Sequence, residues 1–61
     1  MTIQDNLRTI WSILAHKPHT EHELVAASGL TQVEVLEALR SLTRDRIVER
    51  HAGAYRMVKN G

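Results

Sequence analysis

The chain contains no cysteine and no phenylalanine, and it has only one tryptophan and one tyrosine. Without cysteine it can form neither a disulfide framework nor a thiolate metal site, and this absence is typical of proteins from a reducing compartment. Its core must therefore be built from aliphatic side chains. At 61 residues the chain holds one domain, and a domain of that size buries only about 60% of its unfolded surface.

Strong charge and long apolar runs are also missing. The formal net charge is +1 and the sequence pI is about 8.3, so charge alone does not indicate a nucleic-acid partner. No apolar run approaches the roughly 18 residues that span a membrane, and no apolar signal-peptide core follows the start. We therefore expect a cytoplasmic protein without a membrane partner.

A first helix is predicted over residues 3–16 and is stopped by Pro18. Its apolar side chains recur at the spacing of one helical face: Ile3, Leu7, Ile10 and Leu14. Trp11 and Ile13 flank this stripe. Trp11 is interpreted as a core side chain, and the alternative is a place in a subunit interface. In that alternative Ile3, Trp11 and Ile13 form the dimer contact.

Two capping boxes mark the starts of a second and a third helix. Thr20 is followed by Glu23 at the third helical position, and Thr31 is followed by Glu34 in the same way. Gly29 stands where a left-handed cap ends the second helix. The predicted apolar face of that helix consists of Leu24, Val25, Ala26 and Ala27. The third helix runs to about residue 44 or 45, and its buried stripe is Val35, Leu39 and Leu42, with Leu36 and Ala38 beside it.

The segment from residue 47 to residue 58 is predicted to form a β-hairpin around the turn Ala52-Gly53. The predicted cross-strand pairs are His51 with Ala54, Arg50 with Tyr55, Glu49 with Arg56, and Val48 with Met57. Val48, Met57, Tyr55 and the stem of Arg50 then share the inner face. The fold class is mainly α with a small β-hairpin, in one domain over residues 1–58 with a frayed tail at 59–61.

Helix, helix, tight turn, helix and hairpin is an order that resembles the winged helix-turn-helix of bacterial regulators of the MarR, ArsR and isocitrate-lyase-regulator types. The resemblance covers nearly the whole chain and rests on "HELVAASGLTQVEVLEALRSLTRDRIVERHAGAYRM". It implies a three-helix fold whose third helix enters the DNA major groove and whose hairpin, the wing, lies on the backbone. The chain departs from these families at Asp45-Arg46, where they often place a glycine, and its wing is short.

The outward face of the third predicted helix carries the side chains expected to contact DNA. Arg40 and Arg44 lie one turn apart and are predicted to bind guanine edges or phosphates. Glu37 either accepts a hydrogen bond from a cytosine amino group or pairs with Arg40 at the i+3 position. The remaining candidates on this helix are Thr31, Gln32, Val33 and Ser41. The alternative interpretation is a solvated helix face of mixed charge.

The hairpin adds positive side chains that are predicted to contact phosphates: Arg50, His51, Arg56 and Lys59. Their alternative role is that of edge-strand charges that oppose aggregation. From Arg40 onward the chain has six lysines and arginines against two acids, an excess that the net charge of +1 conceals.

Other kinds of site are not supported by the sequence. The histidines at 16, 19 and 22 are separated by the helix break at Pro18, so no metal site is expected. No nucleophile–base pair or glycine-rich phosphate loop is present, so no enzyme activity and no cofactor are expected. The predicted function is sequence-specific binding of double-stranded DNA as a small prokaryotic or phage transcriptional regulator, as a homodimer. The alternative is a winged-helix protein-interaction or dimerisation module that does not bind DNA.

Overall fold

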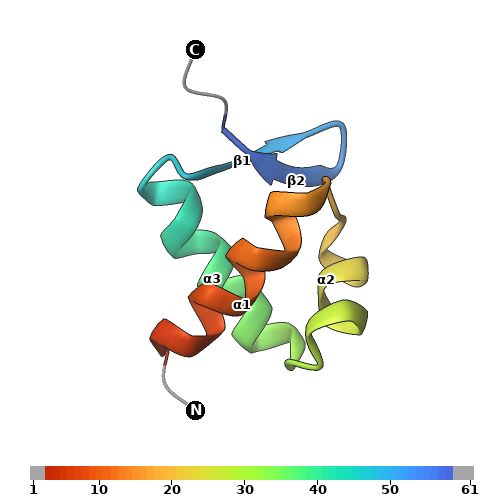
Figure 1. Cartoon of the computed structure of the whole chain (residues 1–61), viewed down its shortest axis with the longest axis vertical. Helices are drawn as coiled ribbons and strands as arrows, with labels where there is room; N and C mark the ends of the chain where they lie inside the picture. The colour runs from red at the N-terminus through yellow and green to blue at the C-terminus, as the bar shows by residue number, and fades with distance from the viewer. Residues whose placement is uncertain (1–2, 59–61) are drawn as a thin grey trace.

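The computed structural model describes residues 3–58 and contains three helices followed by a two-stranded antiparallel hairpin (Figure 1). This confirms the predicted fold class, and the arrangement is compatible with a winged-helix fold. The predictions for Lys59 and for a frayed tail at 59–61 lie outside the described residues. The elements are α1 (Ile3–His16), α2 (Glu21–Ser28), α3 (Gln32–Arg44), β1 (Val48–His51) and β2 (Ala54–Met57).

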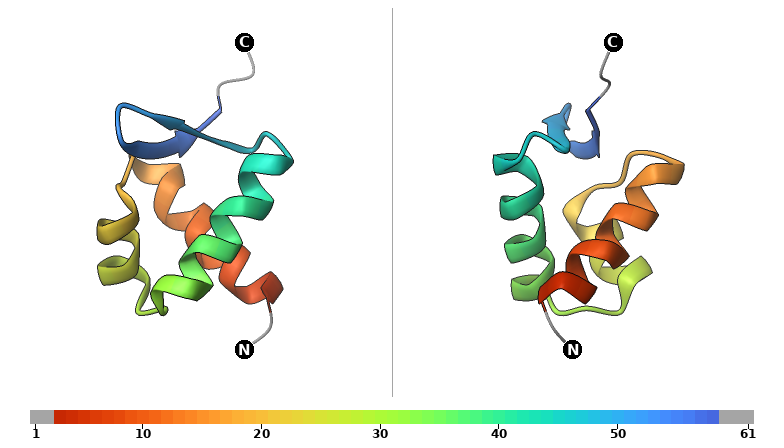
Figure 2. Two further views of the ribbon diagram at one scale, coloured as in Figure 1. Left: turned by 180° about the vertical axis from the view of Figure 1, so that it is seen from behind. Right: turned by 60° about the vertical axis from the view of Figure 1, so that its left-hand side comes forward.

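The core forms where α3 crosses α1, with α2 beside both helices and the hairpin across their ends (Figure 2). The predicted stripe of α3 is buried at every position, and Leu36 beside it is half-buried. In α2 the predicted apolar face is too wide, because Ala26 and Ala27 are exposed. The buried apolar side chains are Ile10, Leu14, Leu24, Leu30, Val35, Ala38, Leu39, Leu42 and Val48.

Trp11 is not a core residue, and the prediction that placed it there is wrong. Its side chain is 44% exposed, whereas Ile10 beside it is completely buried. Successive helical residues point about 100° apart, so Trp11 lies at the side of α1, and the space against α3 is filled by aliphatic side chains. Ile13, on the other flank, is half-buried and packs against the core. The side chain of Ile3 lies outside what the structure describes.

The hairpin has the predicted register, with all four predicted pairs present. Ala52 and Gly53 both have positive φ, at 52° and 82°, as a type I′ turn requires. A contact that the sequence did not reveal fixes the hairpin to the helices. His19, between α1 and α2, donates its N–H to the carbonyl of Tyr55 at 3.0 Å and accepts the N–H of Tyr55 at 2.7 Å. The α1–α2 connection thus adds a one-residue bridge to the free edge of β2.

The chain leaves α3 through a residue in the left-handed region, Arg46, which has φ of 59°. Its N–H donates to the carbonyl of Thr43 at 3.0 Å, and the N–H of Ile47 donates to the carbonyl of Leu42 at 2.9 Å. These two hydrogen bonds form a Schellman motif, in which glycine is the preferred left-handed residue. The position therefore has the backbone that favours glycine, although arginine occupies it.

Replacing Arg46 by glycine should stabilise the domain. An L-residue in the left-handed region costs roughly 1–2 kcal/mol, and the greater freedom of unfolded glycine offsets part of the gain. We expect Arg46→Gly to raise the free energy of unfolding by about 0.5–1 kcal/mol, measured by urea denaturation.

The matched control is Gly29→Ala, which makes the opposite change in a left-handed cap. Gly29 has φ of 74°, and a Cβ there would meet no atom within 4 Å, so any loss arises from the backbone conformation alone. We expect this variant to lose about 1 kcal/mol. An Arg46→Gly protein less stable than the parent would show that the arginine side chain makes a stabilising contact.

Candidate nucleic-acid interface

The start of α3 is held by the predicted capping box. The Thr31 hydroxyl accepts the N–H of Glu34 at 3.2 Å, and the Oε1 atom of Glu34 accepts the N–H of Thr31 at 3.0 Å. Thr31 also donates its hydroxyl to the same carboxylate at 3.1 Å. Glu34 therefore has the structural role that the sequence predicted. Its carboxylate is engaged by the N–H and the hydroxyl of Thr31.

The second carboxylate oxygen of Glu34 joins α3 to α1. The Nδ2 atom of Asn6, a residue only 7% exposed, donates to Oε2 of Glu34 at 3.4 Å. The Oδ1 atom of Asn6 is buried and has no hydrogen-bond partner. A buried amide that contributes one long hydrogen bond positions the two helices more than it stabilises them, because an unsatisfied polar atom is costly. Asn6 thus links α1 to the first turn of α3.

The capping hydrogen bonds lower the pKa of both capping carboxylates. The backbone N–H of Thr31 is the main cause of the lowered pKa of Glu34, with further help from the Thr31 hydroxyl and Asn6. The backbone N–H of Thr20 is likewise the main cause of the lowered pKa of Glu23. It donates to Oε1 of Glu23 at 2.8 Å. Both effects favour the ionised carboxylate, because an N–H group stabilises negative charge.

These shifts make the stability of the fold depend on pH in the acidic range. In the folded state both carboxyls bind protons below their ordinary pKa of 4.5, so near that pH the unfolded state holds more protons. Stability from the two carboxylates is complete above pH 4.5 and is lost as the pH falls through the lowered folded pKa values. Urea denaturation at a series of pH values should therefore show the free energy of unfolding decreasing below pH 4.5.

Glutamine can retain the capping geometry without the titrating charge, so it provides the variants for this test. Glu34→Gln should show a shallower decrease than the parent, and Glu23→Gln combined with Glu34→Gln a shallower one still. Equal slopes in the parent and the double variant would contradict the assignment of acid sensitivity to the caps.

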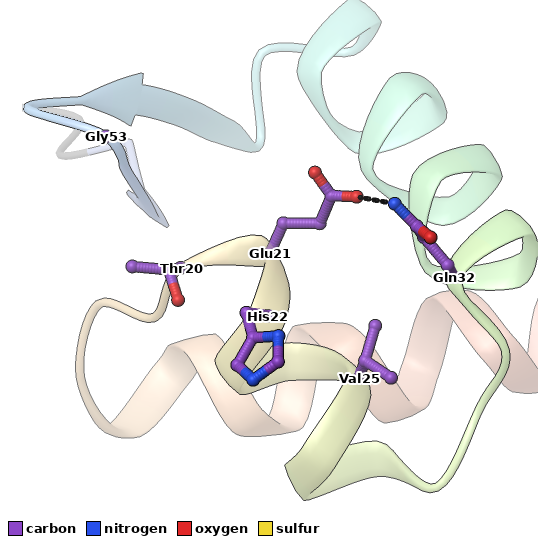
Figure 3. A pocket seen from close by; sticks show the side chains of 6 residues that line it. All are labelled: Thr20, Glu21, His22, Val25, Gln32 and Gly53. Carbon is purple, nitrogen blue, oxygen red and sulfur yellow. Dashed lines mark hydrogen bonds between the residues drawn. The ribbon is translucent and has the colours of Figure 1, made fainter.

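Gln32, one of the candidate DNA-contacting residues, is turned toward α2. Its Nε2 atom donates to Oε1 of Glu21 at 3.1 Å (Figure 3). The two side chains border a cleft of about 390 Å³ between α2, the first turn of α3 and the hairpin turn at Gly53. Glu21 places a carboxylate beside the start of α3. Because this charge repels phosphate, the start of the helix is less suited to the DNA backbone than the rest of its exposed face.

The outward face of α3 lies where the sequence placed it. Val33 is 64% exposed, and Glu37, Arg40 and Arg44 are exposed as well. Ser41 is half-buried, and with the last three it borders a groove of about 350 Å³. No salt bridge joins Glu37 to Arg40, so the i+3 pairing that the sequence left open is not present. Both charges are therefore available to a partner.

A cleft of about 220 Å³ separates α3 from the hairpin and brings two predicted arginines to one site. Arg40 reaches it from α3 and Arg50 from β1, and Tyr55, which shares the inner face of the hairpin with Arg50 as predicted, also lines it. Leu36, Leu39 and Thr43 complete the lining. Neither arginine forms a salt bridge within the described residues. The cleft thus has an apolar floor and two unpaired cations.

The sequence did not predict Leu36, Thr43 or Tyr55 as site residues. Their position follows from two patterns taken together. Leu36 and Thr43 lie on the side of α3 between the buried stripe and the exposed face, and the hairpin register turns Tyr55 toward that side. A helical projection and the hairpin register place these residues on the right faces, but the cleft also depends on how the hairpin packs against α3.

The other predicted hairpin residues do not converge on this cleft. Alternation along the strands turns His51 and Arg56 to the face opposite Arg50. Arg56 pairs with Glu49 across the hairpin, as predicted, with Nη2 3.4 Å from Oε1. The predicted interface therefore divides into an inner group around Arg40 and Arg50 and an outer group in which one arginine is already partnered.

Two further properties describe residues 3–58. No cluster of three or more histidine or acidic side chains in this part of the chain is arranged to hold a metal ion. None of its helices has both the length and the hydropathy that crossing a membrane requires.

No family model, curated protein or solved structure matches the chain. Proposals about its function therefore depend on the geometry of the exposed residues.

Proposed function

We propose that the chain binds double-stranded DNA, with α3 in the major groove and the hairpin on the sugar–phosphate backbone, as a small transcriptional regulator. The observation that supports this most is the group of three exposed arginines without salt bridges: Arg40 and Arg44 on α3, and Arg50 on the hairpin. An arginine that makes no internal ion pair leaves its donors free for phosphate oxygens or guanine edges.

The dimensions of α3 suit a DNA groove. Its 13 residues give a length of about 20 Å, and an α-helix fits the major groove, which is about 12 Å wide. Val33, Glu37 and Arg40 lie on its outward face at one-turn spacing, where a thymine methyl, a cytosine amino group and a guanine edge are their respective partners. Arg44 and Arg50 stand at the end of α3 and on the hairpin, where they would meet phosphates.

Charge along α3 sets the direction in which the helix would enter the groove. Glu21 and Glu34 surround its first turn, whereas the unpaired arginines occupy its second half and the adjoining hairpin. Many helix-turn-helix proteins contact bases mainly through the start of the recognition helix. Here we expect the base contacts to run from Val33 to the middle of the helix at Arg40, and the last turn to lie near the backbone.

The left-handed backbone of Arg46 also supports the resemblance to the MarR, ArsR and isocitrate-lyase-regulator types. These families often have glycine before the first wing strand, and this chain adopts the glycine-like conformation at that place. The His19 bridge fixes β2 to the α1–α2 connection, so the wing has a defined position on the helices. Both features fix the position of the wing on the helices. We infer that this chain and those families hold the wing toward DNA in a similar way.

Substituting the unpaired arginines tests the proposal. We expect Arg40→Ala to weaken binding to a preferred duplex by about 1–3 kcal/mol and to relax sequence preference. Arg50→Ala should weaken binding to all duplexes alike and reduce the slope of log K against log salt by about 1. Fluorescence anisotropy with a library-selected duplex, at several salt concentrations, measures both effects.

Two variants serve as controls for these substitutions. Lys17→Ala removes an exposed positive charge outside α3 and the hairpin, so it should leave the affinity nearly unchanged. Glu21→Gln removes the carboxylate beside the start of α3 and should tighten binding. Absence of any NMR shift in residues 31–44 and 48–57 on adding duplex DNA at low salt would refute the proposal and favour a protein-interaction module.

A further inference from the structure

One side of α1 is exposed and partly apolar, although the core behind it is closed. The half-exposed ring of Trp11 borders a groove of about 400 Å³ with Leu7, Arg8, Gln4 and Ser12. An indole contributes more apolar area than almost any other side chain, so leaving it in water gives up a large favourable transfer free energy. A helix side that ends in such a ring is suited to contact another protein surface.

The exposed residues of this side repeat along the helix with regular spacing. Gln4, Arg8, Trp11 and Ala15 are all exposed and follow each other at i, i+4, i+7 and i+11. The buried stripe of α1 has the same spacing, and each of these four residues follows one of its members directly in the chain. The helix therefore carries two parallel stripes, of which only one is packed against the rest of the domain. We call these four residues the outer stripe. Its spacing is that of a seam between two helices, and it contains no carboxylate.

The outer stripe is complementary to itself when the second helix runs in the opposite direction. A two-fold axis between residues 8 and 11 places Arg8 opposite Trp11 and the long Gln4 opposite the small Ala15. A guanidinium over an indole face is a favourable cation–π contact, and Arg8 has no salt bridge in the described part of the chain. Parallel pairing would instead bring Arg8 against a second Arg8. The chemistry therefore selects an antiparallel arrangement.

We propose that the outer stripe binds the outer stripe of a second copy of this chain, with each Arg8 stacked on the partner's Trp11. A single pair of helices of this length buries less than the roughly 800 Å² per partner of a standard interface. The association is therefore weak and depends on concentration. No outer-stripe residue belongs to the exposed face of α3 or to the cleft beside the hairpin. The inference is independent of DNA binding and is tested without DNA.

Sedimentation equilibrium from about 1 μM to about 1 mM protein provides the first test. The parent should form dimers, and Trp11→Ala should weaken dimerisation at least about tenfold, as expected for a central aromatic contact. Arg8→Glu should weaken it similarly, and Arg8→Lys less, because lysine keeps the cation. The matched control is Val33→Ala, which removes the other large exposed apolar side chain and should leave dimerisation unchanged. Circular dichroism confirms that each variant is folded.

The chain has no cysteine, so introduced cysteines report the direction of pairing without background. A mixture of Gln4→Cys and Ala15→Cys proteins should give mainly the mixed disulfide dimer on mild oxidation. Gln4→Cys alone should cross-link poorly. Efficient cross-linking of Gln4→Cys with itself would overturn the antiparallel arrangement. A parent that stays monomeric throughout the concentration range, or a dimer that Val33→Ala disrupts and Trp11→Ala does not, would overturn the proposal.

Discussion

The structure depends on the crossing of α1 and α3, because this contact supplies most of the small aliphatic core. Ile10 and Leu14 of α1 and Val35 and Leu39 of α3 are buried together. A domain of 61 residues has too little chain to build a second apolar layer outside this one. An apolar side chain that reaches neither this crossing nor the α2 and hairpin residues packed against it stays on the surface, and Trp11 is such a side chain.

The same contact separates the two surfaces that the protein offers to partners. Each of α1 and α3 buries one stripe of side chains against the other helix. Their exposed sides therefore point in different directions (Figures 1 and 2). The outward side of α3, together with the inner face of the hairpin, collects unpaired arginines. The outer stripe of α1 carries an indole and a single cation. One small core thus supports a cationic surface and an aromatic surface that share no residue.

The features that the sequence predicted well are those set by local rules. Both capping boxes, the left-handed Gly29 and the register of the hairpin each depend on residues close together in the chain, and all are present. The exposed face of α3 was also predicted, because helical periodicity determines it once the buried stripe is known.

The features that were missed depend on distances between elements. The Gln32–Glu21 hydrogen bond joins two helices, and the bridge from His19 to Tyr55 joins residues 36 positions apart. Neither leaves a periodic signal in the sequence. The apolar character of Trp11 favours the core, but its angle on the helix places it at the side of α1, away from the buried stripe. Arg50 and Arg56, which look alike in the sequence, differ because strand alternation turns them to opposite faces of the hairpin.

The bridge at His19 also limits how the edge of this small sheet can accept a strand from another molecule. A two-stranded hairpin exposes the unpaired N–H and C=O groups of both its edges, and such edges invite strand addition by other molecules. On the β2 side the position that would accept a neighbouring strand is taken by His19, whose hydrogen bonds occupy both polar groups of Tyr55. Pro18, next to it, has no N–H with which to extend the ladder. The connection between α1 and α2 therefore also occupies the Tyr55 position on the edge of β2, where a strand of another molecule could otherwise form hydrogen bonds.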